Sequence, residues 1–446
     1  MEQTTQKELV REIGRWDFLA LTINAMVGAG VFGLPAKIYG LAGDWSVLAY
    51  LACAGLVTLI TLCFAEVGSR FGETGGPYLY ARAAFGSVIG FEVGWLLWLA
   101  RLTAFAALCN LLLGYISYFW PAAGSGWTRA LVMTGVAIAL TTVNVIGVRE
   151  TALTSDLFTI GKLAPLLLFV LAGFFFLRPH SFTVLTGAPS ALDYGHFSTA
   201  VMLLVFAFSG FEMAVIPAGE IRDPRRDVAF ALLTATGMVA LLYVMIQIVC
   251  IGTLPGLANS ERPLVEASNR FLGVAGATAV SIGAIISVSG TLISNMLAGS
   301  RILYAMAEQG QLPRLLAATH GRFHTPHVAI LISAAVMLVL TLQGTFMSAL
   351  TISTVIRLVV YITTCVAAPA LRLRKDAPPS RFRAPAGAAV AVMATTLSVW
   401  LLWNSPLKDI RAVGLAMALG LLFFFARRRS KRSLSSVGES DSIRAS

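Results

Sequence analysis

Residues 28–33 read GAGVFG and lie inside the first long apolar segment of the chain, shortly before Pro35. Glycine weakens a helix, and a break in a membrane-spanning helix leaves backbone amide and carbonyl groups without intrahelical partners. Amides at the start of a half-helix can bind the carboxylate of a small zwitterion. We therefore predict a substrate-binding site at the backbone of four residues: Val27, Gly28, Ala29 and Gly30.

The same string fits GxGxxG, the fingerprint of dinucleotide-binding loops. We exclude that interpretation because the fingerprint needs a preceding strand and a βαβ unit. Close helix packing through small residues is the structural alternative. A second interruption, Ser209-Gly210 within the apolar segment 198–220, favours the binding site. The carbonyl groups around this second break are predicted to accept a substrate ammonium, at Phe206, Ala207 and Ser209.

Lys162 lies about eight residues, or ~12 Å of helix, into the apolar segment 154–177. An ionisable residue inside a membrane span is costly and is a functional candidate by default. Because desolvation lets a buried lysine alternate between ammonium and amine, Lys162 is predicted to couple protons or to act as a fixed cation. Its expected hydroxyl partners are Thr291 and Ser294. Snorkelling of the side chain to the membrane surface is the alternative.

Among the other charged residues inside apolar segments, three bear on the site: Glu212, Arg101 and Arg357. Glu212, just beyond the second break, is predicted to hold the broken helix or to exchange protons, and pairing with Arg101 or Arg357 is equally open. An arginine that faces the substrate would favour an acidic or polar substrate. An arginine paired with Glu92 or Glu212 would carry no information on specificity. Asn295 is predicted to border the side-chain pocket.

The composition explains why these residues need a membrane context. The chain of 446 residues is 57% hydrophobic and only 12% charged, whereas soluble domains carry roughly 25% charged residues. Continuous apolar runs, rather than alternating ones, predict an all-α membrane protein and exclude a β-barrel. Twelve apolar segments are visible: 16–39, 45–68, 87–119, 127–147, 154–177, 198–220, 229–253, 275–307, 327–342, 346–370, 386–403 and 412–426.

The net charge of +11 has a distribution that indicates membrane topology rather than nucleic-acid binding. If twelve spans alternate from a cytoplasmic N-terminus, 23 of the 33 lysines and arginines lie inside and six outside. Both termini are therefore predicted to be cytoplasmic, in an inner-membrane, multi-pass protein. No cleavable signal peptide is expected, because residues 1–15 are polar and form a cytoplasmic segment. Residues 427–446 form a basic, serine-rich cytoplasmic tail at the bilayer surface.

The two breaks occur in the first and sixth spans, five helices apart. An odd number of helices per repeat reverses orientation, which predicts two inverted repeats. We place repeat one at about 16–177 and repeat two at about 198–370, within a transmembrane domain of residues 16–426. The last two spans, at about 386–426, are additions to this five-plus-five core.

Four stretches of the chain resemble the amino acid–polyamine–organocation superfamily of permeases. They are GAGVFG with Leu34-Pro35, FAFSGFE (206–212) followed by GEIRDP, SRILYAM (300–306) followed by GQLP, and APALR (368–372). The resemblance spans nearly the whole chain. It is nearest to bacterial sodium-independent members that are proton-coupled or exchange substrates, and it implies alternating access and an amino-acid-like substrate.

The resemblance also implies roles for single residues. Phe206 would lie over the substrate as a hydrophobic gate. Lys162, in the motif Gly161-Lys162-Leu163, would stand where sodium-coupled relatives bind their ion, with Thr291 beside it in the coupling site.

We therefore expect a proton-coupled amino acid transporter whose partners are substrate, protons and the lipid bilayer. An amino acid/amine exchanger of the same fold is the first alternative, and a sensor that binds without transporting is the second. No nucleophile–base pair is detectable, so we do not expect an enzyme. No cofactor or metal is expected either, because the histidines 320, 324 and 327 indicate a basic surface loop.

Overall fold

The computed structural model describes residues 13–73, 75–147, 152–178, 192–216 and 218–444. Within these residues the protein is helical, and its sole β-type pairing is an isolated bridge between Ile13 and Ile221. The α-helices are α1 (Arg15–Met26), α2 (Gly30–Gly33), α3 (Pro35–Ala42), α4 (Ser46–Gly68), α5 (Gly76–Phe85), α6 (Ser87–Phe119), α7 (Gly126–Ile146), α8 (Ala152–Phe174), α10 (Tyr194–Ala207), α11 (Phe211–Ala214), α12 (Pro224–Thr253), α13 (Pro263–Glu308), α14 (His327–Gln343), α15 (Phe346–Leu373), α16 (Gly387–Trp403) and α17 (Leu407–Arg444).

The described helices account for the predicted spans. Nine stretches are long and apolar enough to cross a membrane, and three shorter apolar helices cover Gly161–Phe174, His327–Gln343 and Gly387–Trp403. These twelve helical stretches fall on the twelve apolar segments of the sequence, so the all-α membrane fold with about twelve spans is confirmed. Residues 1–12 of the predicted N-terminal segment lie outside the described residues.

Both predicted breaks are present. The first span divides between α1, which ends at Met26, and α2, which begins at Gly30. The sixth divides between α10 and α11, where Gly210 has a φ of +121°. A residue with a Cβ atom rarely adopts this backbone conformation, so glycine permits the chain to turn here.

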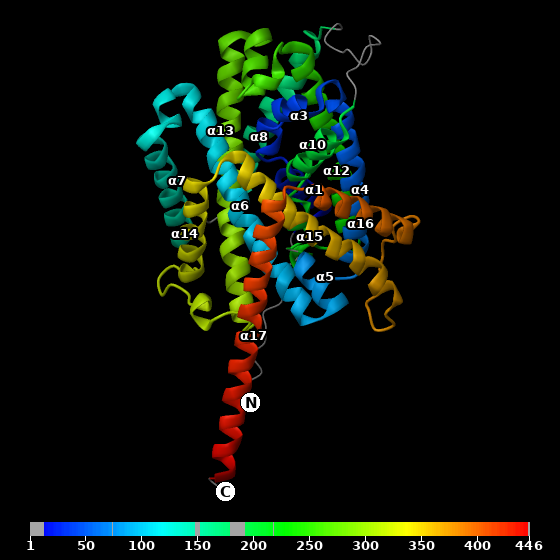
Figure 1. Cartoon of the computed structure of the whole chain (residues 1–446), viewed down its shortest axis with the longest axis vertical. Coiled ribbons are helices and arrows are strands. Elements are labelled where there is room, and N and C mark those ends of the chain that lie inside the picture. The colour runs from blue at the N-terminus through cyan, green and yellow to red at the C-terminus, as the bar shows by residue number, and fades with distance from the viewer. Residues whose placement is uncertain (1–12, 74, 148–151, 179–191, 217, 445–446) are drawn as a thin grey trace.

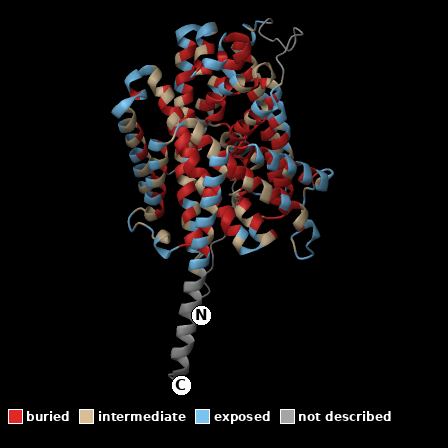
Figure 2. Ribbon diagram, viewed as in Figure 1, coloured by how far each residue is buried: buried red, intermediate tan, exposed pale blue. Residues whose placement is uncertain are grey.

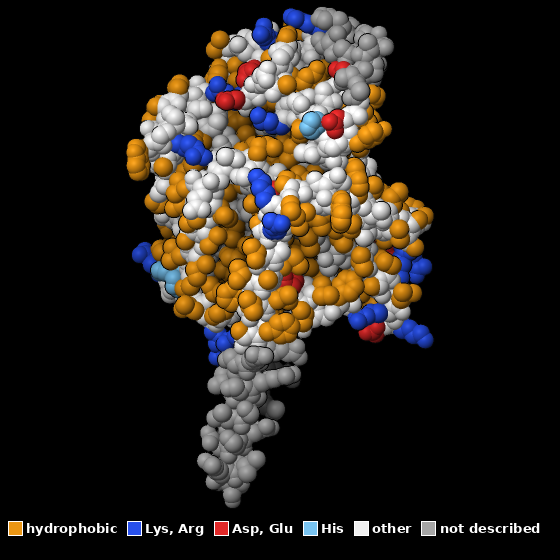
Figure 3. Space-filling model, in the orientation of Figure 1, with side chains coloured by type: hydrophobic (Ala, Val, Ile, Leu, Met, Phe, Trp, Pro, Cys, Tyr) orange, Lys and Arg blue, Asp and Glu red, His pale blue; other side chains and the backbone are white. Residues whose placement is uncertain are grey.

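The bundle surrounds a central helix, α6, which packs against α13, α14 and α15. Figure 1 shows α6 running through the middle of the molecule, with α7 and α14 along one side. Buried residues concentrate in the interior, and exposed ones lie on the outer helices (Figure 2). Several large apolar side chains face outward, including Trp127, Leu131, Leu171, Phe175 and Trp403. In Figure 3 hydrophobic side chains cover much of the flank, as a surface in contact with lipid requires.

The start of α1 is fastened to the segment that follows α11. The Ile13 amide donates to the Glu220 carbonyl at 3.1 Å, and the Arg222 amide donates to the Ile13 carbonyl at 3.1 Å. Arg15 lies 3.7 Å from the Asp227 carboxylate and stacks over the Phe230 ring. The two broken spans are thus linked at one end as well as at their breaks.

Candidate functional site

The two breaks lie against each other with their backbones in contact. A Cβ atom added at Gly30 would stand 2.5 Å from the Cα of Ala207. One added at Gly210 would overlap the carbonyl of Ala25. These glycines therefore allow an approach that no larger residue permits. Close packing, the structural alternative for the first glycine string, is present at Gly30, and it brings the backbones of the two breaks together.

The amides of Ala29 and Gly30 have no hydrogen-bond acceptor among the described residues. The last helical bond of α1 runs from the Val27 amide to the Ile23 carbonyl at 2.9 Å. Within the described chain, no backbone carbonyl accepts a hydrogen bond from the amides of Gly28, Ala29 or Gly30. Gly28 is half-buried, and a Cβ atom there would meet only the methyl group of Thr291, at 3.8 Å. The break therefore offers unpaired amide donors at Ala29 and Gly30.

Carbonyls of the second break already accept hydrogen bonds from other groups of the protein. The Phe206 carbonyl accepts from the Ser209 amide at 3.2 Å and from the Ser209 hydroxyl at 2.7 Å. Since a carbonyl has two acceptor sites, Phe206 has none left for a substrate. The Ala207 carbonyl accepts from the Tyr243 hydroxyl at 3.2 Å and keeps one site. The Ala207 carbonyl can therefore still accept a hydrogen bond from an ammonium in this structure, whereas the Phe206 carbonyl cannot.

Tyr243 of α12 is a site residue that the sequence did not indicate. Its hydroxyl lies 3.1 Å from the Met26 carbonyl and 3.2 Å from the Ala207 carbonyl, so it joins the two breaks. The side chain is buried. One tyrosine among ten, within an apolar helix, carries no signal of this role, because its partners are backbone atoms of other helices.

Lys162 is buried inside the bundle and does not reach the surface of the molecule. Its ammonium donates to the Asn24 carbonyl at 2.9 Å, near the end of α1. The expected hydroxyl partners are directed elsewhere: Thr291 donates to the Ser287 carbonyl at 2.9 Å and Ser294 to the Gly290 carbonyl at 3.1 Å. In the described part of the chain neither hydroxyl bonds to Lys162. The lysine thus contacts the backbone of the broken helix itself.

Glu212 of α11 is the centre of a buried polar cluster. One carboxylate oxygen accepts from Arg101 of α6 at 3.0 Å and from Arg357 of α15. The other accepts from the Tyr361 hydroxyl at 3.0 Å and from the Gly210 amide at 2.7 Å. Of the alternatives left open by the sequence, Glu212 both pairs with the arginines and holds the second break.

Two contacts connect this cluster with the breaks. Arg101 donates to the side-chain oxygen of Asn295 at 3.3 Å, and the Asn295 amide group donates to the Thr291 carbonyl at 2.9 Å. The guanidinium of Arg357 lies 5.9 Å from the centre of the Phe206 ring. The predicted site residues on α2, α10, α11 and α13 therefore form one connected region.

A family model described as amino acid permease matches residues 13–425. The chain belongs to the amino acid permease family. The resemblance carried by the four sequence motifs is thereby confirmed, and the protein is a multi-pass membrane transporter and not an enzyme.

Three relatives show the breadth of the family. The serine/threonine exchanger SteT of Bacillus subtilis is 27% identical over 426 residues, which cover 94% of this chain and 96% of SteT. The branched-chain amino acid permease BcaP of the same species is 24% identical, covering 96% of this chain and 95% of BcaP. Cationic amino acid transporter 4 of Mus musculus is 24% identical, covering 85% of this chain and 62% of the mouse protein.

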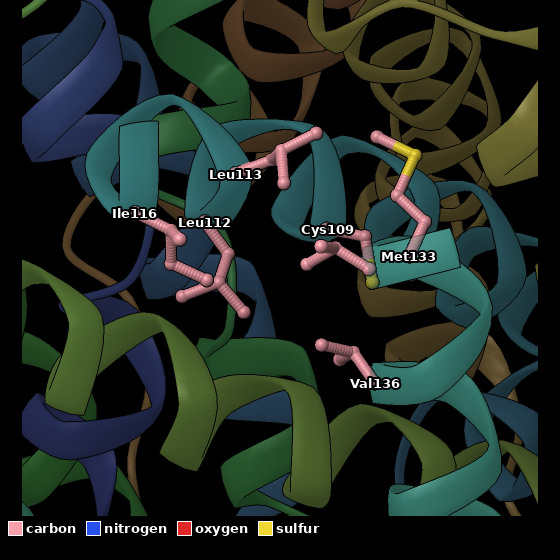
Figure 4. A pocket seen from close by; sticks show the side chains of 7 residues that line it. Cys109, Leu112, Leu113, Ile116, Met133 and Val136 are labelled. Carbon is pink, nitrogen blue, oxygen red and sulfur yellow. The ribbon is translucent and has the colours of Figure 1, made fainter. Parts of the chain in front are cut away.

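The permease also has an apolar pocket that is separate from the predicted site residues. It lies between α6 and α7 (Figure 4) and is lined by Cys109, Leu112, Leu113, Ile116, Val132, Met133 and Val136. A zwitterion needs charged or strongly polar partners, and the thiol of Cys109 is the most polar side chain of this lining. The lining of this pocket therefore does not suit the charged groups of an amino acid.

Proposed function

We propose that this permease carries an amino acid across the cytoplasmic membrane by alternating access, with the substrate held between the two breaks. The unpaired amides of Ala29 and Gly30 support the site, because buried donors without acceptors are rare in folded proteins. They would bind the substrate carboxylate. The free acceptor site of Ala207 and the carbonyl of Ser209 would bind its ammonium.

We further propose that Lys162 couples transport to protons, without sodium. Its ammonium is tied to Asn24 at the end of α1. Loss of the proton would weaken this bond, because a charged donor makes a stronger hydrogen bond than a neutral one, and would loosen the end of α1. Glu212 keeps a structural role in this scheme, because its four acceptor positions are occupied. The distribution of lysine and arginine supports cytoplasmic termini.

Exchange of one amino acid for another is the second candidate. The observation in its favour is that a relative matched along nearly its whole length, SteT, carries the name of a serine/threonine exchanger. The fold and the site would be the same in both candidates. They differ only in whether the transporter can change its access from one side of the membrane to the other without a bound substrate.

Transport by purified protein in liposomes separates the candidates. Under an inward proton gradient, empty vesicles should accumulate an amino acid mixture, and Lys162→Ala should abolish the pH dependence while leaving counterflow intact. Uptake only into preloaded vesicles would establish exchange. Unchanged pH dependence in Lys162→Ala would remove the coupling role. Binding without any accumulation would establish a sensor and overturn transport.

Gly28 offers the sharper test of the backbone site. Gly28→Val places its Cβ atom 3.8 Å from the Thr291 methyl group and adds bulk at the first break, so we expect loss of substrate binding in a folded protein. Gly55→Val is the matched control, because nothing lies within 4 Å of a Cβ atom there. Gly30→Leu does not test the site, since it would collide with Ala207 whether or not a substrate binds. Normal substrate affinity in Gly28→Val would contradict the proposed binding site at the backbone of the first break.

A further inference from the structure

The cluster around Glu212 contains more positive than negative charge. Two guanidiniums, from Arg101 and Arg357, contact a single carboxylate oxygen. Arginine remains protonated in proteins, so the cluster carries one surplus positive charge. Pairing with Glu212 would by itself say nothing about specificity. The excess of two arginines over one glutamate does carry information on specificity.

This surplus lies where water cannot neutralise it. The side chains of Arg101, Arg357 and Glu212 are 8%, 4% and 0% exposed. A buried charge without a counter-ion is strongly destabilising, and a charge inside a membrane span is especially so. An anion close to the two arginines would remove this penalty.

The other glutamates buried within described spans do not supply that anion. Glu92, on the same helix as Arg101, faces the position of Gly420, and its two carboxylate oxygens have no hydrogen-bond partner in the described chain. Glu66 binds Arg372 at the far end of α4. Glu212 is saturated, and the Nε of Arg101 is buried without a partner among the described residues. The arginines therefore retain donor capacity that the protein itself does not use.

Arg101 is also linked to the amide site through neighbouring residues of α13. Thr291 faces Gly28, and Asn295, one turn further along α13, contacts Arg101. One helical turn, ~5.4 Å, separates these two contact residues on α13. Phe206, the expected gate, lies beside Arg357.

We propose that the substrate is an acidic amino acid, whose side-chain carboxylate binds Arg101 and Arg357 while its backbone groups bind the two breaks. This inference rests on the proposed function. The bound side chain would bring the cluster to two positive and two negative charges. Planar guanidiniums match a carboxylate in geometry as well as in charge. A small inorganic anion such as chloride is the other possible source of this negative charge.

The decisive experiment compares isosteres in reconstituted vesicles. Uptake of labelled glutamate and aspartate is measured beside glutamine and asparagine, once in chloride and once in methanesulfonate. We expect the acidic substrates to be favoured by roughly 30-fold or more in both salts, because losing one partner of a buried charge pair has an effect of this size. Equal uptake of acid and amide would overturn the proposal, as would a chloride requirement without preference for the acid.

Variants test the arginines themselves. Arg101→Met leaves Arg357 and Glu212 as a neutral pair, so the preference for glutamate over glutamine should disappear. Arg372→Met, in the separate cluster at Glu66, should leave the preference unchanged. Monodisperse elution and melting in detergent establish that each variant is folded. If Arg101→Met does not fold, the isostere comparison on the unmodified protein still decides.

The outcomes also distinguish the two proposals. Transport of neutral amino acids with exclusion of glutamate would leave the proposed function standing and overturn the acidic substrate. Thermal stabilisation by glutamate and not by glutamine, without accumulation in vesicles, would support the arginine site and overturn transport.

Discussion

Two buried glutamates of this permease each face two arginines, at different depths in the bundle. Glu212 binds Arg101 and Arg357 in the interior. Glu66, near the end of α4, binds Arg372 and lies 3.7 Å from Arg70. Each carboxylate also accepts from a backbone amide, that of Gly210 at 2.7 Å and that of Ala384 at 3.0 Å. The two clusters are therefore alike in their charged groups and in their backbone donor.

They differ in what happens to the surplus charge. At Glu66, Arg70 donates to the Pro378 carbonyl at 2.8 Å, and Arg372 is 30% exposed, so a loop and solvent compensate. Even there, burial has the largest influence on the pKa of Arg70, and it lowers that pKa. At Glu212 all three side chains are nearly or fully buried. A cluster at the membrane end can thus be purely structural, whereas the interior cluster is left with a charge that a ligand can neutralise.

Glu212→Gln should produce the largest effect. It leaves two guanidiniums buried without a carboxylate, which costs about 3–5 kcal/mol, and we expect a fall in melting temperature of roughly 10 °C. Glu66→Gln should cost less, because solvent reaches Arg372. Melting of both variants in detergent checks this order. Equal losses would mean that depth does not distinguish the clusters.

Gly210→Ala should have the next largest effect, because it displaces the amide that holds Glu212. An alanine at a φ of +121° is strained, and its Cβ atom would overlap the Ala25 carbonyl, for a cost of about 2–4 kcal/mol. The counterpart variant at Glu66, Ala384→Gly, should cost only about 0.5–1 kcal/mol. If both variants melt alike, the geometry at the second break is not what positions Glu212.

The sequence predicted the features that depend on composition and local chemistry. Glycines identified both breaks, and an isolated lysine in an apolar span identified a buried cation, Lys162. These inferences succeed because a helix break and the burial of a charge are decided by a few neighbouring residues.

The sequence could not predict which groups meet. Arg101 and Arg357 are 111 and 145 residues from Glu212, and uniformly apolar helices do not show which face points inward. The sequence therefore left open whether the arginines pair with Glu92 or with Glu212. The expected partners of Lys162 were wrong for a related reason, because its acceptor is the Asn24 carbonyl, and backbone groups leave no trace in a sequence.

Tyr361→Phe should have a smaller effect that sharpens the comparison, because the Glu66 cluster has no tyrosine among its hydrogen-bond donors in the described chain. The variant removes one of four donors to Glu212, for a loss of about 1.5 kcal/mol. Arg101 and Arg357 stay in place, so the preference for acidic substrates should persist. Melting and the isostere uptake assay check the two parts. A loss of preference would mean that the tyrosine contacts the substrate.

Arg70→Met should have the smallest effect, and it isolates the role of surplus charge. Like Arg101→Met, it leaves one arginine on one glutamate. Glu66 keeps Arg372 and the Ala384 amide, so the loss is mainly the hydrogen bond to Pro378, about 1 kcal/mol. Melting should fall slightly, and the ratio of glutamate to glutamine uptake should not change. If Arg70→Met altered that ratio as much as Arg101→Met, the preference would reflect the total charge of the protein, and the position of the Glu212 cluster beside the breaks would be irrelevant.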